Sequence, residues 1–294
     1  MMAAARLDST GTEEPLIAVF VDFENVAIGA RDMRAGRFQI QLVLKRLLEK
    51  GRLVFKRAYC DWRHYEDSLR EFHSQGIELI DIPQTKMSGK NSADIRMVVD
   101  ALDLCYSKGH IDTFVLISGD SDFSPLVSKL KENNKRVIGC GVKSSTSDLL
   151  ISNCDEFIYY DDLVRAAQKT ATAPKPAKPD ATKSDGDKKQ EARDRVMEVI
   201  RSLEQDYDFV WGSMLKQAVR RVYPSFNEDY YGYTCFSDVL EDLDDRGLVR
   251  LDFDERRGNY QVRRKIRKAA TDKAGTEKAS AEKTNAEKKS SSKS

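Results

Sequence analysis

The stretch TFVLISGDSDFSPL, residues 113–126, places an uninterrupted apolar run directly before two aspartates, Asp120 and Asp122. A second run, IAVFVD (residues 17–22), ends in the same way in Asp22. Such runs are typical of strands buried on both faces, as in a parallel sheet covered by helices. Ligand groups gather at the carboxyl ends of such strands, so we expect these acids to matter functionally.

Strand-like and helical patterns alternate along the first half of the chain. The alternation continues to the run EFIYY at residues 156–160. Because crossovers between parallel strands are right-handed, it predicts a doubly wound, mainly parallel α/β domain. We place this domain at residues 15–167, after a flexible N-terminus at residues 1–14.

A second, smaller domain follows a polar linker. Residues 168–190 hold no large apolar side chain, so they cannot offset the entropy of ordering and are expected to be disordered. Residues 191–263 show three helical patterns and then two strand-like runs around a Gly-Asn turn, which predicts a winged-helix-like α+β domain. Residues 264–294 repeat around Glu-Lys and are expected to form a disordered Lys/Glu-rich tail.

Composition narrows the class of protein. The chain has 294 residues, of which 40% are hydrophobic and 33% charged, and it contains no apolar run long enough for a membrane span. We therefore expect a soluble protein of the cytoplasm without a membrane partner. The five cysteines form no C-x-x-C pair and the three histidines lack metal-ligand spacing, which argues against structural zinc and a disulfide framework.

The distribution of charge gives no simple signal for nucleic acid. The net charge is +1, and acidic side chains outnumber basic ones in both predicted domains. The basic excess lies in the linker and the tail. Such segments more often solubilise than recognise, although flexible lysines can also hold phosphate electrostatically.

The aspartates allow two readings. Taken singly, Asp22, Asp94 and Asp122 each sit where a helix cap or first-turn acid is common. Taken together with Asp120, they can converge on one rim of the sheet, where their repulsion is costly unless a cation holds them. Oxygen ligands without His or Cys select Mg²⁺ or Mn²⁺, whose common task is activating water against a phosphate.

Three motifs then resemble a known family. FVDFENV, KNSADIRMVVDAL and LISGDSDFSPLVSKLKENNKRVIGCG look like the acidic motifs of NYN domains of the LabA-like branch, which belong with the PIN-like metal-dependent ribonucleases. The resemblance covers about residues 15–165. It implies that Asp22, Asp94, Asp120 and Asp122 are the catalytic, metal-binding acids and that Asn25 is a polar helper. Asp100, in the middle motif, is a weaker candidate.

The small domain is similar to the OST-HTH (LOTUS) module through GSMLKQAVRRVYPSFNEDYYGYTCFSDVLEDL, residues 212–243. That family implies RNA binding, including G-rich folded RNA, and an NYN domain followed by OST-HTH is a familiar pairing. Trp62 and Trp211 we assign to packing. The side chains that we expect at RNA are Lys86 and Lys90, in the polar loop before the Asp94 helix, and Arg220, Arg221, Tyr230, Tyr231 and Tyr233.

The resulting prediction is a Mg²⁺- or Mn²⁺-dependent ribonuclease whose second domain recognises RNA. The alternative is a non-catalytic RNA-binding or scaffolding protein that keeps the acidic motifs as a platform. A HAD-type phosphatase also ends its first strand in D-x-D, but Glu24 and Ser124 replace residues which that chemistry needs. Protein partners remain unspecified by the sequence.

Overall fold

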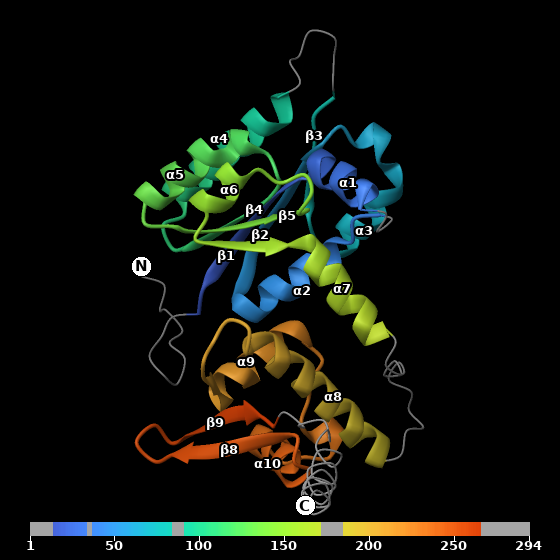
Figure 1. The fold of residues 1–294 in the computed structure, drawn as a ribbon, viewed down its shortest axis with the longest axis vertical. Helices are drawn as coiled ribbons and strands as arrows, with labels where there is room; N and C mark the ends of the chain where they lie inside the picture. The colour runs from blue at the N-terminus through green and yellow to red at the C-terminus, as the bar shows by residue number, and fades with distance from the viewer. Residues whose placement is uncertain (1–13, 34–36, 84–90, 172–184, 266–294) are drawn as a thin grey trace, which may run out of the picture.

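A computed structural model describes residues 14–33, 37–83, 91–171 and 185–265. Within these ranges the chain forms a large sheet covered by helices and, after it, a small domain built on its own sheet (Figure 1). No helix in the described part of the chain is long and apolar enough to cross a membrane.

The large sheet has six strands in the order β3-β2-β1-β4-β5-β6, and every neighbouring pair is parallel. The chain builds outward from β1 to β3, crosses over to β4 on the other side of β1, and builds outward again. The predicted doubly wound α/β fold is therefore confirmed. The strands are β1 Leu16–Asp22, β2 Arg52–Cys60, β3 Glu78–Asp81, β4 Thr113–Ile117, β5 Arg136–Gly141 and β6 Glu156–Tyr159.

Helices cover both faces of this sheet. On one face lie α1 Phe23–Asp32, α2 Ile40–Lys50, α3 Glu66–Ser74 and α7 Tyr160–Ala171. On the other lie α4 Ser92–Ser107, α5 Ser124–Glu132 and α6 Asp148–Asn153. Two short 3-10 turns follow strand ends, η1 Trp62–His64 after β2 and η2 Ser121–Phe123 after β4.

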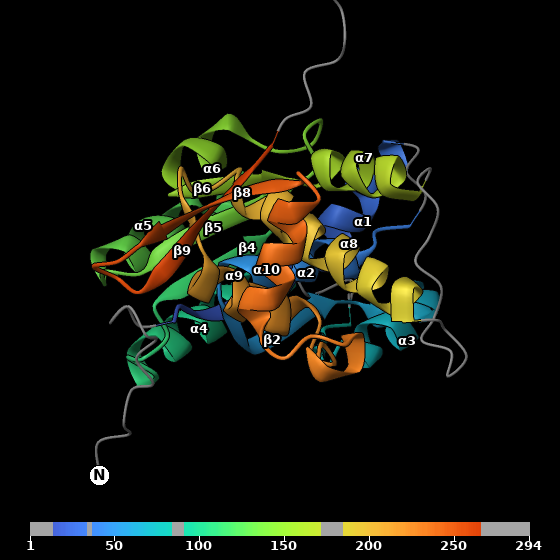
Figure 2. The same ribbon diagram turned by 90° about the horizontal axis from the view of Figure 1, so that it is seen from below.

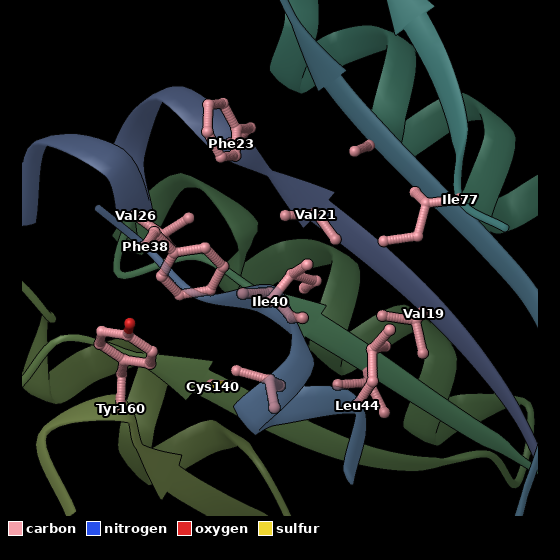
Figure 3. Packing of buried hydrophobic residues seen from close by; sticks show 14 of the residues in the cluster. Val19, Val21, Phe23, Val26, Phe38, Ile40, Leu44, Ile77, Cys140 and Tyr160 are labelled. Carbon is pink, nitrogen blue, oxygen red and sulfur yellow. The ribbon is translucent and has the colours of Figure 1, made fainter. Parts of the chain in front are cut away.

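Two hydrophobic cores flank the sheet, and β1 contributes to both. Its odd-numbered residues from Ile17 to Val21 enter the core under α1 and α2, whereas Ala18 and Phe20 enter the core under α4 and α5. Figure 3 shows the first of these cores, where Phe38 and Tyr160 pack beside Ile40 and Cys140. Because both faces are covered, the strand reads as a continuous apolar run rather than an alternating one.

The small domain combines three helices with a three-stranded antiparallel sheet, as expected of a winged-helix-like α+β unit. Its sheet order is β7-β9-β8, and the β8–β9 hairpin turns through Gly258, whose φ of 59° is left-handed. One hydrophobic core joins helices and sheet. The elements are α8 Asp185–Leu203, β7 Val210–Trp211, α9 Gly212–Val222, η3 Asp229–Tyr231, α10 Phe236–Asp245, β8 Val249–Asp254 and β9 Asn259–Arg264.

Helices extend into both ends of the predicted linker at 168–190. Helix α7 continues to Ala171 and α8 begins at Asp185, while residues 172–184 lie outside the described residues. The early start of α8 has a tertiary cause, because Lys188 and Lys189 lie over the rings of two tyrosines, 5.3 and 5.0 Å from the ring centroids. Contacts of this kind cannot be predicted from the pattern of apolar residues in the sequence.

The predicted ends of the chain fall mostly outside the described residues. Residues 1–13 and 266–294 are not described. At the predicted start of the tail, Arg264 instead ends β9, where it pairs with Val249 of β8.

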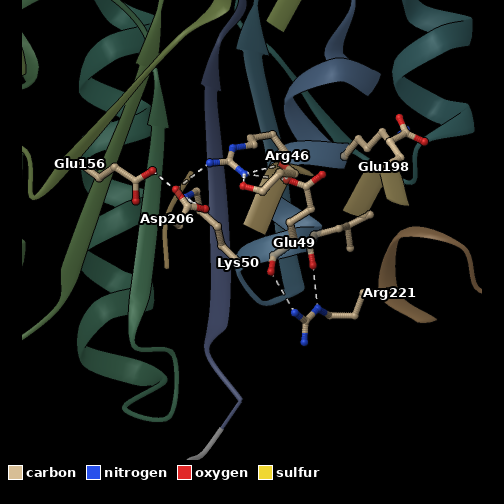
Figure 4. Close-up of polar contacts among 10 residues, drawn as sticks. Arg46, Glu49, Lys50, Glu156, Glu198, Asp206 and Arg221 are labelled. Carbon is tan, nitrogen blue, oxygen red and sulfur yellow. Dashed lines mark hydrogen bonds and ion pairs between the residues drawn. The ribbon is translucent and has the colours of Figure 1, made fainter. Parts of the chain in front are cut away.

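The small domain docks on α2 of the large one through buried charges (Figures 1, 2 and 4). Arg46 donates to Asp206 at 2.7 Å and to Glu49 at 2.8 Å, and Lys50 lies 2.8 Å from the same Asp206. Arg221 donates to the carbonyl oxygens that end α2, at 2.6 and 3.0 Å. The two domains are thus held by defined contacts and not by a tether alone.

The small domain docks at the N-terminal ends of the strands of the large sheet. Helix α2 ends at Lys50, directly before β2 starts at Arg52, and β1 starts beside it at Leu16. The carboxyl end of β1, at Asp22, lies at the opposite edge next to α1 (Figure 1). A seven-residue strand spans about 23 Å, which separates the docked domain from the acidic rim.

Candidate metal-binding acidic site

Asp22 is the most deeply placed acid of the rim. It ends β1 and caps α1, and its carboxylate accepts hydrogen bonds from Ser118 Oγ at 2.8 Å and from the Asn25 backbone N–H at 3.4 Å. Only 8% of the residue is exposed. Burial is the main cause that raises the pKa of Asp22 to about 7; the charges of Asp94 and Asp120 also raise it, and the hydrogen bonds from Ser118 and Asn25 lower it.

Asp94 approaches the same point from another element. It lies in the first turn of α4, as predicted. Burial raises its pKa to about 6, and the next causes are the charges of Asp120, Asp122 and Glu24. Carboxylates from β1, α4 and the loop after β4 are therefore near enough to interact electrostatically, which independent helix caps would not do.

The loop after β4 is shaped by its own hydrogen bonds. The Asp122 backbone N–H donates to Asp120 Oδ1 at 2.9 Å, and the Asp120 backbone N–H donates to Ser118 Oγ at 3.2 Å. Asn25 Oδ1 accepts from the Gly119 N–H at 2.8 Å, which ties this loop to α1. Asn25 is therefore a positioning residue that fixes one acidic segment against the other.

Three further side chains belong to the rim. Ser118 is fully buried and bridges Asp22 to the next loop, Glu24 adds charge near Asp94, and Asn91 Nδ2 donates to Asp122 Oδ2 at 3.4 Å. The D-x-E-N and S-G-D-S-D patterns contain Glu24 and Ser118, so sequence could have included them. Asn91 has no signal beyond its position before α4.

The donor set fits a hard divalent cation. Its members are carboxylate, amide and hydroxyl oxygens, without sulfur or imidazole. In the described ranges, no three His, Cys, Asp or Glu side chains form a group that could by itself hold an ion. Mg²⁺ keeps several waters and uses one or two carboxylates with substrate phosphate, so an open rim of this kind suits it.

Asp100, the weaker candidate, has a structural role instead. Its carboxylate accepts from Tyr59 Oη at 2.9 Å and pairs with Arg57 at 3.1 Å and Arg96 at 3.0 Å. It is directed at β2 rather than at the rim. The spacing of the middle motif alone could not separate it from Asp94, because both lie on α4.

The residues predicted to contact RNA differ in their exposure to solvent. Lys86 and Lys90 lie outside the described residues. Arg220 is exposed over 55% of its side chain, as an RNA contact requires, although it also pairs with Glu228 at 3.3 Å. Arg221 is wrong as an RNA contact, because its side chain is only 14% exposed and its guanidinium donates to carbonyl oxygens at the end of α2.

The tyrosine prediction also needs correction. Tyr231 and Tyr233 are 3% and 7% exposed and belong to the core of the small domain, so neither can stack on a base. Tyr230 is 41% exposed. In so small a domain large aromatic side chains supply much of the buried area, and the sequence pattern does not show which ring turns inward.

The two tryptophans also differ in burial. Trp62 is 5% exposed and stacks on Phe23 at 5.1 Å, so its packing role is confirmed. Trp211 is only partly buried, and the guanidinium of Arg257 lies 4.9 Å from its ring centroid. It faces the outer side of the small sheet.

The parallel six-stranded sheet with helices on both faces is consistent with a PIN-like fold. Residues 16–161 match the NYN domain family, so this part of the chain is an NYN domain. NYN domains belong to the PIN-like nuclease superfamily, whose members generally use divalent metals, and NYN nucleases act on RNA.

Two proteins are similar to this chain. An uncharacterized protein of Methanocaldococcus jannaschii, MJ0482, is 30% identical over 147 residues, which are 49% of this chain and 55% of that protein. The chain thus spans about half the length of this relative. A protein of unknown function from Vibrio parahaemolyticus, VPA0982, has a crystal structure that matches with 26% identity and a TM-score of 0.45, over 55% of this chain and 98% of that one.

Proposed function

We propose that this protein is a metal-dependent ribonuclease that hydrolyses RNA phosphodiester bonds at the acidic rim. The observation that carries the proposal is the convergence of Asp22, Asp94 and Asp120 from three separate elements at the carboxyl edge of β1 and β4. Repulsion among neighbouring carboxylates, of which Asp22 is buried, is costly in a protein that needs them only as caps. In an NYN domain the same carboxylates would bind a metal ion.

Asp22, Asp94 and Asp120 would hold Mg²⁺ or Mn²⁺ together with water and the substrate phosphate. The bound ion would supply an activated water and neutralise charge on the phosphate. Ser118 holds the Asp22 carboxylate in place, and Asn25 fixes the loop that carries Asp120. Asp122, the exposed acid of the set, is placed to orient the attacking water.

A cleavage assay with a matched metal series tests this function. Full-length protein is incubated with single-stranded and folded RNA, including a G-rich fold, in Mg²⁺, in Mn²⁺ and in excess chelator. Cleavage in either metal that chelator abolishes supports the proposal. Binding of the same RNAs without cleavage in any condition would favour the alternative, a non-catalytic RNA-binding or scaffolding protein.

We also propose that the small domain is an OST-HTH module and that it contributes RNA affinity through the outer face of its sheet. Trp211 pairs with Gln261 on that face, Arg257 lies over Trp211, and Arg263 lies 5.1 Å from the ring centroid of Phe209. Phe209 is 49% exposed. Exposed rings beside guanidinium groups suit stacked bases and phosphates.

The variant Phe209→Ala tests this second role in the full chain. RNA affinity should fall severalfold while the melting temperature stays the same, because the ring is half exposed. Tyr207→Ala, a nearby ring that is 40% exposed, serves as the control. Unchanged affinity in Phe209→Ala would exclude the outer face as the RNA contact.

A further inference from the structure

A basic cleft of about 410 Å³ opens beside the acidic rim, on the α1 and α3 side of the sheet. Phe23, which directly follows Asp22, forms part of its wall. The ring of Tyr65 packs edge-to-face against the ring of Phe23, with 5.1 Å between the two centroids. The rest of the wall comes from α1, from Arg37 and Phe38 before α2, and from residues 63–68 after β2. Its volume falls within the range of small-ligand pockets, roughly 300–1,000 Å³.

The cleft lies beside the rim, because Phe23 of its wall directly follows Asp22. In the sheet, Tyr59 of β2 lies beside Asp22 of β1, so the chain that leaves β2 runs past the rim before it reaches Tyr65. The electrostatics agree, since burial raises the pKa of Tyr65, the charges of Glu24 and Asp22 raise it further, and Arg31 lowers it. Tyr65 therefore interacts electrostatically with acids of the rim and with Arg31.

Three arginines and His64 line this cleft beside two acids, Glu66 and Asp67, and the four basic side chains are well exposed. Arg37, Arg63 and His64 expose 68%, 60% and 71% of their side chains. Arg31 is exposed at the end of α1 and has no ion pair with any carboxylate of the described residues. Arg37 pairs with Asp67 at 2.5 Å, but this pair is open to solvent, so a phosphate can compete for it.

We propose that this cleft binds one nucleotide of single-stranded RNA next to the scissile phosphate, with Arg31 and Arg37 on the phosphate and Tyr65 against the base. The inference rests on the proposed function and adds the direction of the strand, which leaves the acidic rim toward α1 and α3. Guanidinium groups match phosphate geometry, and base stacking on an aromatic ring tolerates any sequence.

Binding of a fluorescently labelled octauridylate to the full chain tests the subsite. Anisotropy is recorded in chelator, so that no cleavage occurs, across a series of salt concentrations. Arg31→Ala and Arg37→Ala should each weaken binding about tenfold at low salt. Each should also reduce the slope of log affinity against log salt by roughly 0.7.

Two further variants sharpen the test. Asp67→Asn removes the carboxylate that competes for Arg37, so it should bind the oligonucleotide more tightly than wild type. Arg165→Ala, on α7, removes an equally exposed arginine outside the cleft and should leave affinity and salt slope unchanged. Melting temperatures of all variants check that each is folded.

The outcomes separate this inference from the nuclease itself. Weaker binding in the two arginine variants with tighter binding in Asp67→Asn supports the subsite even if no condition yields cleavage. Wild-type affinity and slope in Arg31→Ala and Arg37→Ala overturn it, even if the protein cleaves RNA. An equal loss in Arg165→Ala also overturns it, because the arginines would then act only through net charge. Displacement of the oligonucleotide by an acidic peptide, but not by uridine monophosphate, would assign the cleft to a protein partner.

Discussion

Replacing Asp22 by Asn should change how the stability of the metal-free protein depends on pH. The folded state raises the pKa of this carboxyl from 3.8 to about 7, mainly through burial. Between these values the folded protein binds more protons than the unfolded chain, so its stability falls as pH rises. Below pH 4 the penalty is absent, and above pH 7 it is complete.

The magnitude follows from the size of the shift. About three pKa units at about 1.4 kcal/mol each correspond to about 4 kcal/mol lost between pH 4 and pH 8. An asparagine can still accept from the Asn25 N–H and contact Ser118, and it carries no charge. The Asp22→Asn protein should therefore gain about 4 kcal/mol relative to wild type over this pH range.

Urea denaturation in chelator, at intervals from pH 4 to pH 8, measures this difference. Asp32→Asn, an exposed aspartate at the other end of α1, controls for the effect of removing any charge. The reasoning would be refuted if the difference between Asp22→Asn and wild type were flat across the range, or if it fell as pH rose. Asp22 would then be an ordinary helix cap.

Three other outcomes are expected. Adding Mg²⁺ or Mn²⁺ at a hundred times its dissociation constant should stabilise wild type by roughly 2.7 kcal/mol and Asp120→Asn by clearly less, as melting with and without metal will show. Arg46→Met should cost about 3–5 kcal/mol by urea denaturation, because it leaves the buried Glu49 without its ion-pair partner; an effect under 1 kcal/mol would mean that the interface is solvated. Tyr231→Ala should destabilise the small domain by about 3–5 kcal/mol; weakened RNA binding at unchanged stability would restore the stacking role.

The sheet and the acidic set were predictable because their signals are local. A strand buried on both faces must be apolar throughout, so IAVFV and FVLIS announce central strands. Once two strands are central and parallel, their carboxyl ends share an edge. Asp22 and Asp120 follow those ends directly, and Asp94 follows from the first turn of α4.

The contacts of the small domain were not predictable in the same way. In sequence, Arg46 and Glu49 look like a common i,i+3 pair on a solvated helix. Their burial depends on Ser202 and Asp206, more than 150 residues away along the chain. Arg221 was misplaced for the same reason, since an arginine at a helix end gives no sign of which surface it will meet.

The basic cleft could not be predicted from the sequence either. In the structure Phe23 is buried and Tyr65 only partly so, a difference that the sequence does not show. Arg31 and Arg37 lie in a polar stretch between two helices and carry no motif. Only the sheet register, which sets β2 beside β1, brings these side chains next to the acidic rim.

Two aspartates on one helix offer the most direct test of the central claim. Asp94 faces the acidic rim from the first turn of α4, whereas Asp103 is exposed on the same helix two turns later. RNA cleavage by wild type, Asp94→Asn and Asp103→Asn is compared in Mg²⁺ and Mn²⁺ after identical purification. A metal-dependent ribonuclease at this rim predicts a loss of at least a hundredfold for Asp94→Asn and the wild-type rate for Asp103→Asn. Equal rates in all three proteins would contradict it, because cleavage would then not depend on the converging carboxylates.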